Sequence, residues 1–213
     1  MIASIPKSGI YFPNLVGSLF LRALEDELGR TGVSAVMNLA GFPSWLENGL
    51  PEDLKRELDL NVFSKISASL EEMYGPRSGR AIARRIGWDM FHHIRKAAAL
   101  RFVAYRFGTK LIPGRRRMAA ILLDTSRFAG EFLEGSIVVG EKTDELSLSI
   151  QFCPVCWGRK TNRPICYLLV GILEEGMRWM TNAKEVNVIQ TECSAAGDDR
   201  CTFRFQLGSE DSE

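Results

Sequence analysis

The segment RPICYLLVGILEEGMRWM, residues 163–180, is the stretch on which the fold depends. Pro164 stands where the first turn of a helix accepts proline. Apolar residues follow at helical spacing: Ile165, Leu168, Leu169, Ile172 and Met177. Apolar and polar residues alternate on both sides of this helix, in LSLSIQF (146–152), EVNVIQTEC (185–193) and CTFRFQL (201–207). Because 136–152 divides into two strands at a turn, the order is strand–strand–helix–strand–strand.

The residues before this unit are predicted to be helical. Asn14 can cap a helix that ends at Gly29, and Pro51 is placed to open another. Further helices are expected over 33–39, from 61, from 78 and beyond 113. Helices followed by strands are typical of an α+β fold. We therefore expect an N-terminal helical layer packed on a C-terminal four-stranded antiparallel sheet with one crossover helix.

This order suggests how the chain is organised. Residues 1–135 would form the helical part, which supplies dimer contacts and the wall of a pocket. Residues 136–207 would form the subdomain with a cysteine site, and the charged end 208–213 is expected to be disordered. The 46% apolar and 25% charged residues are typical of a soluble globular protein. The sequence lacks the uninterrupted apolar stretches of a secretory signal or a membrane span, so a cytoplasmic protein is expected.

All five cysteines lie in the last third of the chain, spaced C-x2-C-x9-C-x26-C-x7-C. Cys153 and Cys156 can present two thiolates to one ion from a single turn, and Cys193 and Cys201 flank a turn between strands. Cys166 lies at the start of a helix, where the helix dipole favours a thiolate. Zinc suits such a set. The alternative is that these cysteines are small buried core residues.

Enzymatic function receives little support from the residues. A nucleophilic cysteine needs a histidine base, and the two histidines, His92 and His93, lie in a helix far from the cysteines in sequence. The chain has no phosphate-binding loop, nucleophile elbow or dinucleotide fingerprint. We therefore expect a protein that is not an enzyme.

The C-terminal pattern resembles the 4-vinyl reductase domain family. The family has a cysteine at a helix start, a glycine five residues later, and a strand that ends in C-x-A-x-G-D-x-x-C-x-F. The matching residues here are Cys166, Gly171, Cys193, Ala195 or Ala196, Gly197, Asp198, Cys201 and Phe203. The resemblance implies a fold like that of TRAPP-type tethering subunits and of the sensor domains of aromatic-responsive activators. It also implies a homodimer that binds a small hydrophobic or aromatic ligand.

In the aromatic sensors, a structural zinc is held by the helix-start cysteine, the two turn cysteines and an acid three residues before the first of these. Carried over, the resemblance implies Cys166, Cys193 and Cys201 as ligands. The acid is replaced here by Gln190, and a carboxamide is a poor zinc ligand. Either the zinc has been lost, or Cys153 or Cys156 supplies the fourth thiolate.

Three residues are candidates for contact with a ligand. His93 lies near the apolar row of the helix that begins at 78, and Trp88 lies one turn earlier. Trp157 follows the C-x-x-C motif. A histidine on an apolar face is more often a hydrogen-bonded core residue, and both tryptophans could simply close the core.

The net charge of +1 conceals a strongly basic segment. Residues 77–117 contain twelve basic residues and one acidic residue, Asp89, so this segment carries +11 and the rest sums to −10. We expect a small-molecule-binding or sensor domain with a structural zinc. One alternative is an enzyme or accessory protein that acts on a tetrapyrrole, as the family name implies. A second is an interaction module that binds nucleic acid or an anionic membrane through 77–117.

Overall fold

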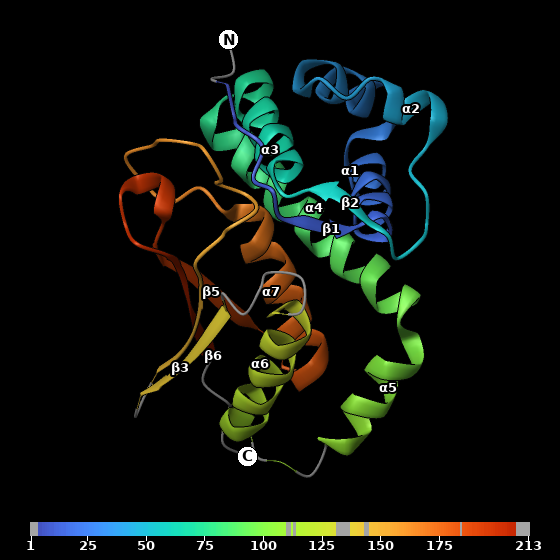
Figure 1. Ribbon diagram of the computed structural model, residues 1–213. Coiled ribbons are helices and arrows are strands. Elements are labelled where there is room, and N and C mark those ends of the chain that lie inside the picture. The colour runs from blue at the N-terminus through green and yellow to red at the C-terminus, as the bar shows by residue number, and fades with distance from the viewer. Residues whose placement is uncertain are drawn as a thin grey trace.

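The computed structural model describes residues 4–109, 112, 114–130, 137–142, 145–183 and 185–207, so the predicted tail at 208–213 lies outside the described residues. The helices are α1 (Asn14–Ala40), α2 (Ser44–Asn48), α3 (Asn61–Tyr74), α4 (Pro76–Ala97), α5 (Ala99–Gly108), α6 (Gly114–Gly130) and α7 (Tyr167–Thr181) (Figure 1). The strands are β1 (Tyr11–Pro13), β2 (Arg56–Asp59), β3 (Ile137–Lys142), β4 (Glu145–Ile150), β5 (Val186–Glu192) and β6 (Cys201–Leu207).

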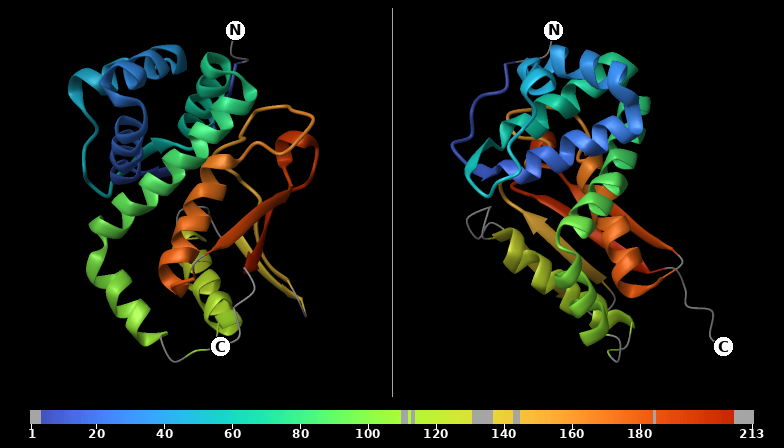
Figure 2. Two further views of the ribbon diagram at one scale, coloured as in Figure 1. Left: turned by 180° about the vertical axis from the view of Figure 1, so that it is seen from behind. Right: turned by 90° about the vertical axis from the view of Figure 1, so that its right-hand side faces the viewer.

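The C-terminal half is built on one antiparallel sheet with the strand order β3-β4-β6-β5. One face is apolar and buried, because Leu146, Leu148, Phe203 and Phe205 point to the same side. Helices α6 and α7 cover this side of the sheet (Figure 2). The α+β class, the four-stranded antiparallel sheet and the helical N-terminal part are therefore confirmed, and α7 is the crossover helix between β4 and β5.

Helix α4 joins the N-terminal helices to this sheet, because it packs against α1, α3 and α7. At its crossing with α7 the two backbones touch. A Cβ atom on Gly171 would lie 2.0 Å from the carbonyl oxygen of Arg84, and one on Gly87 would lie 2.3 Å from that of Leu168. Glycine is required at both positions, since any side chain would force the helices apart. One continuous hydrophobic core includes residues of both halves.

The prediction of a helix opening at Pro51 is wrong. The chain is extended there, and β2 pairs antiparallel with β1. The cause is long-range pairing: the backbone N–H groups of Asn14 and Leu15 donate to the carbonyls of Lys55 and Asp53 at 2.9 and 3.0 Å. These bonds satisfy the N-terminal donors of α1. They hold 53–55 in a conformation that its local helix propensity does not favour.

The start and the middle of α1 also differ from expectation. The Asn14 side chain does not cap the helix but donates to the carboxylates of Asp53 and Glu57, at 2.9 and 2.8 Å. The break at Gly29 is present, because its φ of 64° is not helical. The chain nevertheless continues as a helix to Ala40. None of the helices in the described part of the chain combines the length and apolar character that crossing a bilayer requires.

Candidate metal centre

The five cysteines, separated by up to 48 positions in sequence, come together at one end of the sheet. Cys153 and Cys156 lie in the loop after β4, and Cys166 is the residue that precedes α7. Cys193 follows β5 and Cys201 begins β6. All five thiols are buried and none forms a disulfide. Cys153 and Cys166 are 3.4 Å apart between their Sγ atoms, as are Cys156 and Cys201, and Cys166 and Cys201 are 3.9 Å apart.

These distances fit a tetrahedral thiolate site. With Zn–S bonds of about 2.3 Å, the sulfurs of a regular tetrahedron lie about 3.8 Å apart. The Sγ atoms of Cys153, Cys156, Cys166 and Cys201 all lie within 4.8 Å of one another. A set of four thiolates suits zinc, and it leaves no open coordination position for a substrate. The described residues thus contain a donor set that fits a structural zinc ion.

The electrostatics of the cluster favour a thiolate at Cys201. Its pKa lies far below the usual range, because the S–H group of Cys153, and then those of Cys156, Cys166 and Cys193, donate to its sulfur. The backbone N–H of Ser194 also points at this sulfur, at 3.4 Å. Burial acts in the opposite direction at Cys166 and raises the pKa of its thiol. An uncompensated thiolate here is costly, and a cation would offset that cost.

Cys193 and Gln190 complete the surroundings. The Sγ of Cys193 lies 3.9 Å from that of Cys166, and its backbone N–H donates to the Asp198 carboxylate at 2.7 Å. Gln190 accepts the backbone N–H of Cys166 through Oε1, at 2.9 Å, and donates through Nε2 to the carbonyl of Glu192. Both groups of Gln190 are thus engaged by the backbone. It holds the start of α7 against β5.

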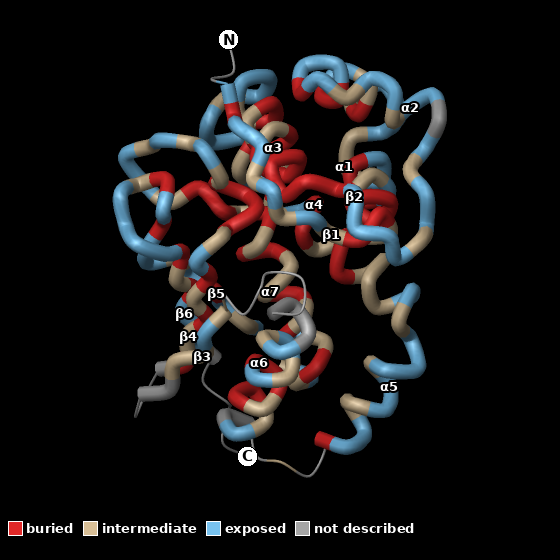
Figure 3. Tube along the Cα trace, in the orientation of Figure 1, coloured by how far each residue is buried: buried red, intermediate tan, exposed pale blue. Residues whose placement is uncertain are grey.

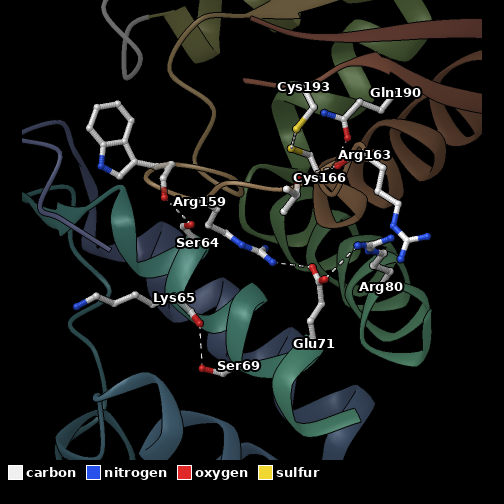
Figure 4. A network of polar contacts seen from close by, with 12 residues as sticks. Ser64, Lys65, Ser69, Glu71, Arg80, Arg159, Arg163, Cys166, Gln190 and Cys193 are labelled. Atoms are coloured by element: carbon white, nitrogen blue, oxygen red, sulfur yellow. Dashed lines mark hydrogen bonds and ion pairs between the residues drawn. The ribbon is translucent and has the colours of Figure 1, made fainter. Parts of the chain in front are cut away.

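A buried ion-pair network fixes the C-x-x-C loop to the helices (Figure 4). The Glu71 carboxylate on α3 accepts from Arg159, which follows the motif, at 2.9 Å and from Arg80 on α4 at 3.3 Å. The Ser64 hydroxyl donates to the carbonyl of Trp157 at 2.8 Å. Sequence reasoning missed these residues, because only the fold brings 64–80 next to 157–159.

Replacing Glu71 with glutamine is expected to lower the free energy of unfolding by about 3 kcal/mol, because two largely buried guanidinium groups lose their carboxylate. Thermal unfolding measures this change. The control is Glu25→Gln, which breaks an exposed pair with Arg30 and is expected to cost less than about 1 kcal/mol. Equal costs for the two variants would show that the network does not hold the loop.

The three predicted ligand contacts have separate protein partners. His93 Nε2 lies 2.6 Å from the Asp26 carboxylate on α1. The Trp88 indole N–H donates to Glu174 at 3.3 Å, and that of Trp157 donates to the carbonyl of Pro6 at 3.2 Å. The structure therefore does not bring these three polar groups to one point, and their role in ligand binding stays a prediction.

Comparison with known families places the sulfur cluster inside a recognised domain. The 4-vinyl reductase domain matches residues 146–207, which contain β4 from Leu146 onward, α7, β5, β6 and all five cysteines. Two uncharacterized proteins of Methanocaldococcus jannaschii are similar in sequence. MJ0855 is 36% identical over 70 residues, which are 32% of this chain and 30% of that protein. MJ0745 is 29% identical over 105 residues, 49% of this chain and 54% of that protein. The alignments thus span about a third and about half of the relatives' lengths.

Solved structures extend the likeness to the whole chain. A doubly substituted H-NOX protein designated Tt has a TM-score of 0.56 at 15% identity and covers 94% of this chain and 97% of its own. The H-NOX of Shewanella woodyi has a TM-score of 0.55 at 12% identity, with 94% and 96% covered. The phenol-responsive domain of the activator PoxR has a TM-score of 0.47 at 16% identity, with 84% and 90% covered. The chain therefore carries a 4-vinyl reductase domain at residues 146–207, within a fold that it shares with H-NOX proteins.

Proposed function

We propose that this protein is a non-enzymatic small-molecule-binding or sensor domain, stabilised by a structural zinc ion that cysteine thiolates hold. The observation that carries the proposal is that the match to the 4-vinyl reductase domain includes every residue of the sulfur cluster. The family resemblance implies binding of a small hydrophobic or aromatic ligand by a homodimer. The absence of recognised catalytic motifs from the sequence agrees with a binding role.

The zinc ion would have a mechanical role. When bound, it supplies a tetrahedral crosslink between thiolates that are distant in sequence. Cys153 and Cys156 would attach the loop after β4, Cys166 the start of α7, and Cys201 the start of β6. Gln190 aids this arrangement because it fixes the backbone of Cys166. A ligand bound against α4 would then meet a rigid wall, since α7 touches the α4 backbone at Gly87.

Trp88 is the candidate contact whose position suits such coupling. It lies on α4 beside Arg84, whose guanidinium group makes two bonds of 2.7 Å to the buried Glu174 of α7. Glu174 also accepts from the backbone N–H of Val188 on β5, at 3.3 Å. A ligand at Trp88 would therefore act on a polar network that joins α4, α7 and the sheet.

Ligand binding can be tested with phenol as a minimal aromatic probe. Phenol is expected to raise the melting temperature of the wild type in a concentration-dependent way, because a ligand that binds only the folded state stabilises it. Trp88→Phe removes the indole N–H but keeps an aromatic ring, and it is expected to weaken binding about tenfold, the effect of losing one hydrogen bond.

The same assay separates the alternatives. Small molecules released by denaturing the purified protein would be identified by mass spectrometry. Protoporphyrin would serve as a tetrapyrrole probe, since binding shifts its absorbance. Binding of protoporphyrin without binding of phenol would favour the tetrapyrrole alternative. An empty extract, with no response to either probe, would contradict the proposed function.

A further inference from the structure

Helix α5 presents an apolar face to solvent. Leu100, Val103 and Phe107 are 90%, 47% and 70% exposed. Their spacing of three and four residues puts them on one side of the helix. None of the residues of α5, all of which the structure describes, is buried. Figure 3 shows this helix standing away from the body of the molecule in exposed and intermediate colours. Ordinary packing therefore does not explain these large apolar side chains.

The charges around this face have one sign. Residues 90–123 contain eight lysines and arginines and no aspartate or glutamate. Lys96 and Arg101 are exposed at the start of the helix, and Arg116 is exposed on α6. Asp124 is the nearest acid, 3.7 Å from the Arg101 guanidinium group. The face thus combines exposed apolar side chains with a basic border.

This combination selects the partner. A second copy of the chain docked through the same face would bring two basic borders together, and like charges oppose such a contact. Nucleic acid would pair with the arginines, but binding driven by phosphate contacts gains nothing from Leu100 and Phe107. The surface of an anionic bilayer accepts both features, since apolar side chains enter the boundary of the acyl chains while lysine and arginine meet the headgroups.

We propose that the exposed face of α5 docks the protein on the surface of an anionic phospholipid bilayer. The helix lies along the surface and does not cross the bilayer, in agreement with the lack of a membrane-spanning helix among the described residues. The inference goes beyond the proposed sensor function, and neither the zinc site nor ligand binding depends on it.

The test is co-sedimentation of the full chain with vesicles of phosphatidylcholine alone and with vesicles that also contain phosphatidylglycerol. Wild-type protein is expected to bind the anionic vesicles at least about tenfold more tightly, and added salt is expected to weaken this binding. The double variant L100D/F107D is expected to lose it. The control is Leu54→Asp, at an apolar residue that is 74% exposed outside α5, which is expected to leave binding unchanged.

The variant should fold, because neither substituted residue of α5 is buried. Unchanged zinc content and phenol response would verify this, and they separate failure of this inference from failure of the proposed function. Equal binding to both kinds of vesicle, or to neither, would overturn it. A dimer that L100D/F107D converts to a monomer would identify the face as a contact between copies. Binding to duplex DNA that survives L100D/F107D, without binding to vesicles, would assign the basic border to nucleic acid.

Discussion

Replacing Gly171 with alanine is expected to lower the free energy of unfolding by more than about 3 kcal/mol, the upper part of the range for overpacked cores. The added Cβ would lie 2.0 Å from the Arg84 carbonyl oxygen, which belongs to a backbone and cannot turn away. The helices α4 and α7 would have to separate. Because α7 begins beside Cys166, this separation would also disturb the sulfur cluster, so thermal unfolding and zinc content should both change.

The matched control is Gly108→Ala at the end of α5. A Cβ there meets no atom within 4 Å, and the position has no positive φ. Alanine costs less backbone entropy than glycine, so this variant is expected to be neutral or stabilised by up to about 1 kcal/mol. If Gly171→Ala unfolds at the same temperature as Gly108→Ala, then the close contact between α4 and α7 is not a requirement of the fold.

Replacing Cys201 with serine is expected to remove the zinc ion and to lower the stability by about 4 kcal/mol, the linkage contribution of a ligand present at a thousandfold excess over its dissociation constant. For a chain of this length, such a loss corresponds to a fall in melting temperature of about 8–16 °C. Cys201 carries the largest effect because the other thiols donate to its sulfur. Zinc content by elemental analysis and thermal unfolding check this prediction.

Cys193→Ser provides the internal comparison. Cys193 lies outside the four sulfurs that are mutually within 4.8 Å, so this variant is expected to retain zinc and to lose less stability than Cys201→Ser. Loss of zinc in Cys193→Ser with retention in Cys153→Ser would give the opposite assignment, in which the turn cysteines act together as the resemblance implies. Retention of zinc in both Cys201→Ser and Cys166→Ser would exclude the sulfur cluster as the metal site.

Much of the C-terminal half could be predicted from the sequence, because its signals are local. Strict alternation in 146–150 and 201–207 reports a sheet with one buried face. Gly197, expected to allow a turn, has a φ of 106°. The segment at 51–58 was misread because its state depends on bonds to 14–15, which local propensity does not encode.

The candidate site was predictable in its donors but not in its geometry. Cysteine spacing indicated that the thiols could meet, yet it left open whether Cys153 or Cys156 joins the set, and in the structure both sulfurs lie in the cluster. The role of Gln190 was not visible in the sequence, because it depends on a bond to the backbone of a residue 24 positions away. The same holds for Glu71, whose two arginine partners come from separate parts of the chain.

The central claim is that the 4-vinyl reductase segment is built around a zinc–thiolate centre, and a native mass spectrum of freshly purified protein tests it most directly. We predict a mass that exceeds the sum of the chains by one zinc ion per chain, with the extra mass lost on acidification as the thiolates are protonated. A metal-free chain with five free thiols, from cells supplied with zinc, would contradict the claim.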